Sequence, residues 1–381
     1  MEAVAKRLRD FLFSDIGRAE QHLLASLFSI GLFGFLLLYV GITQPDLRDH
    51  MAFSGKMMAG EIRVAHPVFF FLLQLFSFFS GNPSMLLFAA FLCFAFAQYG
   101  KLIQSIRLCE TIREKPVSRL LFLLLLGCQL AIGFILLQPG YIRASLSPNF
   151  FHNGTLLLSL APSLFLLNQS LLFLKDGNRS RIFRMMAAGI LIVLIKPSFL
   201  FCWIPVLPVY VFFSEGAGKK LWGILQVGLL LIFCLLAQSL FLKNSNLDFK
   251  LVFDPFRYFG NAKSHVLVFT AAAFFPLSTL LPGWTAWKKG TGLLLGMMTL
   301  QGLVLSFCFF DRIKNIISPN MTWQSSIMHY LLLLFGSIIL VDLLEKRKFA
   351  SALIPLLAYL AQLASGLQYL RISTLIKSFF I

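Results

Sequence analysis

Acidic side chains are scarce in this sequence, and charged side chains of either sign are few. The chain has 381 residues with 16 Asp and Glu, and charged residues make up 13% of it. A soluble globular domain carries about 25% charged residues. This scarcity excludes an ordinary soluble domain. The 58% hydrophobic content and the mean hydropathy of +0.81 exclude a disordered chain.

Paired cysteines and the common catalytic and nucleotide-binding motifs are also lacking. None of the six cysteines belongs to a CxxC pair, and five lie inside apolar runs, so we expect neither a disulfide framework nor a zinc site. No P-loop, GxSxG, HExxH or dinucleotide fingerprint is present. The sequence motifs therefore predict no metal site.

Long apolar runs fill most of the chain. A membrane-spanning helix needs ~20 apolar residues, so a chain of this length has room for about ten or eleven spans and no separate soluble domain. We predict an all-α polytopic transmembrane protein, with residues 1–381 forming one integral membrane domain. The predicted spans are 22–42, 84–106, 119–138, 155–174, 221–242, 265–281, 291–310, 324–343 and 349–367, with a further apolar segment at 185–213.

Two apolar segments are irregular. The run 67–79 is too short to cross a bilayer, so we predict a re-entrant or interfacial helix there. The run 185–213 is interrupted by Lys196-Pro197, so we predict two half-spans with their turn at 196–198 on the outer side.

Basic residues predict the orientation. Lys and Arg gather in segments 107–119, 175–184, 219–220, 288–289 and 346–348, which should be cytoplasmic. Segment 1–21 is predicted to be a short amphipathic cytoplasmic helix. The net charge of +17 is then explained by cytoplasmic loops, without a nucleic-acid partner. We expect an integral protein of the bacterial inner membrane, with the lipid bilayer as its environment.

Chemically capable side chains gather in the predicted outer segments. In segment 43–66, Asp46 and His50 are spaced i,i+4 on one predicted helix face, which suits a general base and its orienting imidazole. An interfacial helix cap explains this pattern equally well. His66 precedes Pro67 at the entry to the short helix, where an ordinary interfacial histidine is the slightly favoured alternative.

Three further segments hold candidate groups. Segment 139–154 carries Arg143, Asn149, His152 and Asn153, which suit sugar hydroxyls or phosphate oxygens. Lys196 lies in an apolar run, where a charge is costly and often functional, although a lysine reaching to the interface is the alternative. Segment 243–264 mixes charges with aromatic residues and is expected to be an amphipathic interfacial helix, a lid or a membrane anchor.

These motifs together resemble the GT-C class of polytopic glycosyltransferases, which use polyprenyl-phosphate-linked sugars. The first similarity is Asp46-x-x-x-His50 followed by His66-Pro67. The sequence from Ser147 to Thr155 is similar to an Asn-x-Trp-His-Asn-Pro-Thr pattern of bacterial membrane proteins in this class, with Phe151 in place of Trp and Gly154 in place of Pro. Lys196-Pro-Ser-Phe followed by Ile204-Pro205 is similar to a segment of the same group. The resemblance covers about residues 20–210.

The resemblance implies an inverting transfer of a sugar from a lipid-phosphate donor to a cell-envelope glycan or lipid acceptor at the outer membrane face. Asp46 would be the general base and His50 would assist it. Lys196 and Arg143 would face the leaving phosphate. Asp49, His66, Asn149, His152 and Asn153 would bind substrate. Some members of the class use a divalent metal ion, and the resemblance leaves that open for Asp46 and Asp49.

Two other classes remain as alternatives. A transporter or flippase for lipid-linked glycans would place charges near mid-membrane on several spans. The apolar runs carry essentially one such charge, Lys196, which favours an enzyme over a transporter. A scaffold subunit of a membrane complex is the third interpretation.

Overall fold

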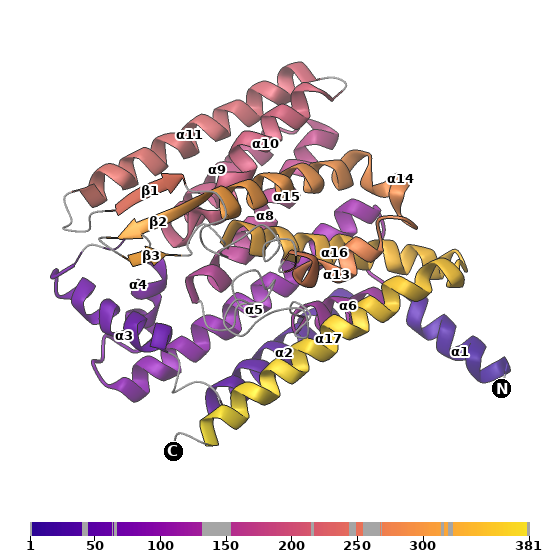
Figure 1. The fold of residues 1–381 in the computed structure, drawn as a ribbon, viewed down its shortest axis with the longest axis horizontal. Helices are drawn as coiled ribbons and strands as arrows, with labels where there is room; N and C mark the ends of the chain where they lie inside the picture. Colours follow the sequence, from indigo (N-terminus) through magenta and orange to yellow (C-terminus); the bar gives the residue numbers. More distant parts are fainter. Residues whose placement is uncertain are drawn as a thin grey trace.

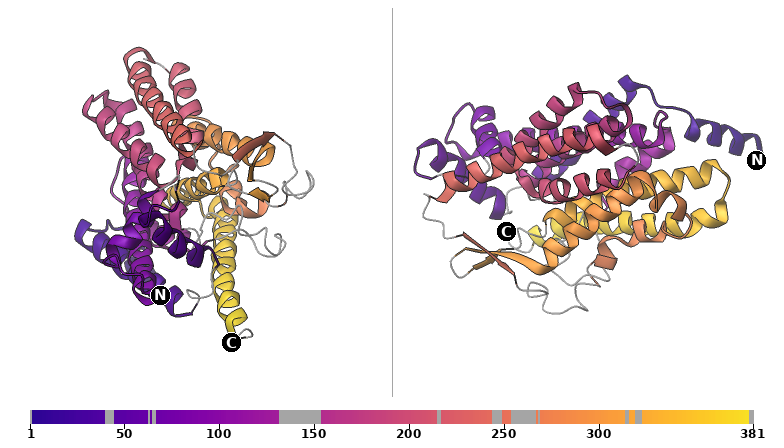
Figure 2. Two further views of the ribbon diagram at one scale, coloured as in Figure 1. Left: turned by 90° about the vertical axis from the view of Figure 1, so that its left-hand side faces the viewer. Right: turned by 90° about the horizontal axis from the view of Figure 1, so that it is seen from above.

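A computed structural model describes residues 2–39, 45–62, 64, 67–131, 154–214, 217–243, 249–253, 267, 269–313, 316–318 and 323–378. Within these ranges the chain is a bundle of helices packed side by side, with a small sheet at one end (Figure 1). Further views show α1 projecting from the opposite end of the bundle (Figure 2). The prediction of an all-α polytopic protein is thus confirmed at this level.

The helices begin and end at the following residues: α1 Glu2–Phe13, α2 Arg18–Tyr39, α3 Pro45–Met58, α4 Pro67–Phe76, α5 Pro83–Arg113, α6 Arg119–Cys128, α8 Gly154–Asp176, α9 Ser180–Ile195, the 3₁₀ turn η2 Pro197–Phe199, α10 Leu200–Phe212, α11 Ala217–Lys243, α13 Phe274–Ser278, α14 Trp284–Trp287, α15 Gly290–Cys308, α16 Trp323–Glu345 and α17 Phe349–Ser378.

In the described part of the chain, six helices are long and apolar enough to cross a membrane, and the bent pair α9 and α10 makes a seventh. This is fewer than the predicted ten or eleven. One reason is that the described helix at predicted span 119–138 ends at Cys128 after 10 residues. A second is that the apolar run 265–281 turns at Ala273, so that α13 has 5 residues.

Both irregular segments take the local structure that the sequence predicts. Helix α4 has 10 residues and is followed by Phe78 and Phe79 in the left-handed region, with φ of 54° and 56°. The chain changes direction by 119° between α9 and α10. The helix breaks here because Lys196 is extended and Pro197, which has no backbone N–H, begins the next turn.

Helix α16 forms the centre of the bundle. In its apolar stretch 89% of the residues are buried within the bundle, whereas in the apolar stretch of α11 22% are buried. Helix α16 contacts α5, α6, α13, α15 and α17, and Figure 1 shows α11 on the outside. An apolar helix that is buried all round packs in the interior, while the exposed leucines of α11 are left for lipid.

Three strands form an antiparallel sheet in the order β1-β2-β3, where β1 is Phe249–Phe253, β2 is Phe309–Ile313 and β3 is Ile316–Ser318. In the register Lys250 is opposite Arg312, and Arg312 is opposite Ile317. Of the alternatives for segment 243–264, the amphipathic helix is therefore wrong for residues 249–253. Aromatic and branched side chains favour strands when a partner strand is present, and here β2 supplies one.

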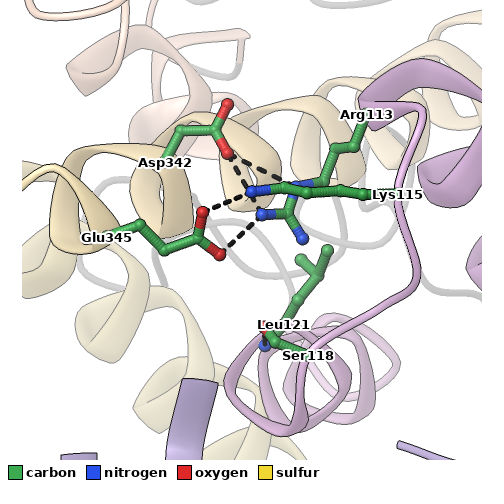
Figure 3. Close-up of polar contacts among 6 residues, drawn as sticks. All are labelled: Arg113, Lys115, Ser118, Leu121, Asp342 and Glu345. Atoms are coloured by element: carbon green, nitrogen blue, oxygen red, sulfur yellow. Dashed lines mark hydrogen bonds and ion pairs between the residues drawn. The ribbon is translucent and has the colours of Figure 1, made fainter. Parts of the chain in front are cut away.

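Ion pairs tie the predicted cytoplasmic segments together at the end opposite the sheet. Arg113 bonds Glu345 at 2.7 Å and Asp342 at 3.3 Å, and Lys115 also bonds Glu345 (Figure 3). Arg119 pairs with Glu20, Lys175 pairs with Glu114, and the hydrogen bond from Lys175 holds the pKa of Glu114 below its usual value. Segments 1–21, 107–119, 175–184 and 346–348 thus share one end, here called the basic end.

Candidate functional site

Helix α3 carries the acidic residues of the first predicted outer segment. It begins at Pro45, so Asp46, Asp49 and His50 all lie in its first two turns. Proline suits the first turn because that turn has no intrahelical partner for its N–H. The predicted helix is confirmed, and Asp46 and His50 occupy positions i and i+4 on one face.

The imidazole of His50 packs between α3 and α4. Its ring lies edge-on to Phe69 at 5.4 Å and to Phe70 at 5.5 Å between ring centroids. Phe69 is fully buried and stacks at 5.9 Å on Phe94 of α5. An edge-on aromatic environment holds the imidazole in one orientation.

Helix α8 begins against the same aromatic rings. A Cβ added at Gly154 would lie 2.4 Å from Phe94 and 2.6 Å from Phe69. No side chain fits there without moving a ring. This packing explains why position 154 is a glycine.

Lys196 is buried at the break between α9 and η2. The residue is 9% exposed, and its Nζ lies 4.6 Å from the ring centroid of Trp323, the first residue of α16. The ammonium therefore stacks on an aromatic face within the bundle and does not extend into solvent. A desolvated contact of this kind is worth about 2 kcal/mol.

Helix α4 connects these two groups, because it contacts both α3, which bears His50, and α9, which ends at Lys196. Both groups thus lie towards the end of the bundle opposite the basic end. Of the remaining predicted site residues, the side chains of Asp46 and Asp49 lie outside the described part of the structure. So do His66, Arg143, Asn149, His152 and Asn153.

A second buried lysine, Lys101 of α5, is not among the predicted site residues. It is 1% exposed, and its Nζ lies 4.0 Å from the ring centroid of Tyr330. Lys196 is therefore not the single buried lysine among the described residues. The signal was present in the sequence, because Lys101 lies inside the predicted span 84–106.

A network of polar side chains surrounds the ring that Lys101 contacts. The Tyr330 hydroxyl lies 2.8 Å from Ser105 Oγ and accepts a hydrogen bond of 2.8 Å from Gln129 Nε2. The side-chain oxygen of Gln129 accepts a 2.9 Å bond from Gln98 Nε2. Hydrogen bonds among these buried groups join α5, the end of α6 and α16.

The two lysines meet α16 on the same face. Trp323 and Tyr330 are seven residues apart, which is about two helical turns or ~10 Å of rise. His329 is also fully buried, and neither of its ring nitrogens has a hydrogen-bond partner among the described residues. Helix α16 therefore carries buried polar side chains among its apolar ones.

The described residues bring together no group of three or more His, Cys, Asp or Glu side chains that could hold a metal ion. The fold and its apolar helices define an all-α polytopic integral membrane protein. Comparison with family models, with curated proteins and with solved structures finds no match for this chain.

Proposed function

We propose that this protein is a membrane glycosyltransferase that moves a sugar from a polyprenyl-phosphate donor to a glycan or lipid acceptor of the cell envelope. The observation that supports this is the buried ammonium of Lys196 at the break between α9 and η2. A lipid-phosphate leaving group develops negative charge as its bond to the sugar breaks, and a preorganised cation stabilises that charge most in a water-excluded site.

In this proposal the acceptor hydroxyl attacks the anomeric carbon, and the bond from that carbon to the phosphate oxygen breaks. Asp46 takes the hydroxyl proton, and the lipid phosphate leaves beside Lys196. Attack from the face opposite the leaving group inverts the anomeric carbon. His50, held edge-on by Phe69 and Phe70, orients the base.

The proposed reaction takes place on the outer face of a bacterial inner membrane. The supporting observation is that the described basic segments share the end away from Lys196 and α3, and basic loops favour the cytoplasm.

Donor binding tests the role of Lys196. Purified protein in nanodiscs is titrated with a polyprenyl phosphate and, separately, with the corresponding neutral polyprenol. Lys196→Gln should weaken phosphate binding at least about tenfold, the equivalent of ~1.4 kcal/mol, and leave polyprenol binding unchanged. Equal affinity of wild type and Lys196→Gln for the phosphate would contradict the assignment.

Translocation of a lipid-linked glycan is the second candidate, and Lys101 is the observation that favours it. Two buried lysines from other helices contact one face of α16, at positions ~10 Å apart along that helix. Transport pathways use intramembrane charges of this kind. Lys101→Met discriminates the two candidates in correctly folded protein. A transferase should keep phosphate-dependent binding at Lys196 and sugar transfer, whereas a translocator should lose movement of the lipid-linked glycan between leaflets.

A further inference from the structure

The basic end of the bundle contains a cleft of about 870 Å³ between α1, the α5–α6 turn and the α16–α17 turn. Five cations line it: Lys6, Arg9, Arg113, Lys115 and Arg347. The acidic lining residues are Asp10, Asp15 and Glu345. The lining therefore has an excess of positive charge.

Two of these cations are already neutralised. Arg113 and Lys115 both bond the carboxylate of Glu345, as Figure 3 shows. Lys6, Arg9 and Arg347 form no ion pair with any residue in the ranges that the structure describes, and all three are exposed. These three side chains are available to an anionic ligand.

Helix α1 presents an apolar stripe on the face opposite the residues that line this cleft. Val4, Leu8 and Phe11 are 70%, 57% and 55% exposed, and their i, i+4, i+7 spacing puts them on one face. Lys6 and Arg9 fall on the other side of the helix. An exposed apolar stripe opposite cations is the pattern of a helix that lies in the membrane interface.

The end of α1 nearest the bundle is anchored. Ile16 donates its backbone N–H to Val117 O at 3.1 Å, and Arg119 donates to Ser14 Oγ at 2.6 Å. Arg119 also pairs with Glu20 at 2.9 Å. The cleft is therefore bounded by packed structure on the bundle side, next to the ends of the membrane-spanning helices.

We propose that this cleft binds the headgroup of an anionic phospholipid. The phosphate contacts Lys6, Arg9 and Arg347 in the cleft, while Val4, Leu8 and Phe11, on the opposite face of α1, insert among the acyl chains of the surrounding bilayer. The stripe favours a lipid over a free phosphate, because it holds α1 at the membrane interface, where anionic headgroups are concentrated. The site is separate from Lys196 and does not depend on the proposed reaction.

Lipid binding to the full-length protein tests this proposal. Detergent-solubilised protein is titrated with phosphatidylglycerol, phosphatidylcholine or glycerol phosphate, and bound molecules are counted by native mass spectrometry. Wild type should prefer phosphatidylglycerol. The triple variant Lys6→Gln, Arg9→Gln, Arg347→Gln should bind it on the order of a hundredfold more weakly, from roughly a fivefold loss per cation. Since these side chains are exposed, the substitutions leave the packed core intact.

A matched variant removes the same charge elsewhere. Lys219, Lys288 and Lys289 are exposed basic residues outside the cleft, and Lys219→Gln, Lys288→Gln, Lys289→Gln should retain phosphatidylglycerol binding. Equal losses in the two triple variants would show a general charge effect and overturn the site. No preference for phosphatidylglycerol over phosphatidylcholine, or equally tight binding of glycerol phosphate, would also overturn it.

Discussion

At the scale of single residues, the interior pairs each described buried lysine with an aromatic ring. Lys101 lies over Tyr330 and Lys196 over Trp323. Removing an ammonium from water is costly, and the ring face offsets part of that cost. The sequence shows both lysines in apolar runs. It does not show which rings receive them, because those rings are more than a hundred residues further along the chain.

The hydroxyl of Tyr330 is expected to stabilise the fold. Tyr330→Phe removes the hydrogen bonds of its hydroxyl with Ser105 Oγ and Gln129 Nε2, which keep their bonds to the backbone oxygens of Lys101 and Leu125, so it should lower the free energy of unfolding by about 0.5–1.5 kcal/mol. Denaturant-induced unfolding in detergent measures the change. Combining it with Gln129→Leu should give a coupling of at least about 0.5 kcal/mol, and strict additivity would contradict the network.

The close approach at Gly154 gives a second expectation. Gly154→Ala places a methyl group against Phe69 and Phe94 and should cost about 1–3 kcal/mol of stability through overpacking. Gly228 of α11 is the matched control, because a Cβ there meets nothing within 4 Å. Gly228→Ala should be neutral or should stabilise the helix by about 0.5–1 kcal/mol. Equal thermal stability of the two variants would show that the α8 start is not tightly packed.

At the scale of elements, hydrophobic run length predicts the helices well and the sheet poorly. The apolar stretches that form α5, α8, α15 and α16 can be recognised in the sequence because each has about the length of a bilayer span or more. The break at Lys196-Pro197 was also visible. Strand β1 was not, because its partner β2 begins 56 residues after β1 ends and short strands need such long-range pairing.

Disulfide formation tests the sheet. In a variant with Cys308→Ser, cysteines at Lys250 and Arg312 should oxidise readily, because these residues are opposite each other in β1 and β2. The control pair is Lys250→Cys with Ile317→Cys. Ile317 lies one strand further, at about 9.6 Å from two inter-strand spacings, and should not crosslink. Crosslinking of the control alone would contradict the strand order.

At the scale of the whole molecule, the described basic segments lie at one end and the site candidates towards the other. Ion pairs between α5, α16 and the α5–α6 turn hold the basic segments together at their end. Of the predicted site residues, the structure describes the side chains of His50 and Lys196, and both lie towards the end opposite the basic end.

The proposed sidedness predicts labelling by a membrane-impermeant maleimide. In intact spheroplasts, cysteines introduced at Lys115, Lys219 and Lys348 should stay unlabelled until the membrane is permeabilised. Cysteines at Met58 and Asn82 should be labelled at once, because Met58, which ends α3, and Asn82, in the turn between α4 and α5, are both exposed. The reverse pattern would place the basic end outside.

The most direct measurement for the central claim is sugar transfer by purified, reconstituted protein from polyprenyl-phosphate sugars to a panel of cell-envelope acceptors. Wild type should transfer sugar. Asp46→Asn should reduce the rate by about 10² to 10⁴ through loss of the general base, and Lys196→Gln should also reduce it, in protein that keeps the wild-type melting temperature. Transfer that is undiminished in Asp46→Asn and Lys196→Gln would contradict the proposed site, and absence of transfer by wild type from every donor would contradict the proposed reaction.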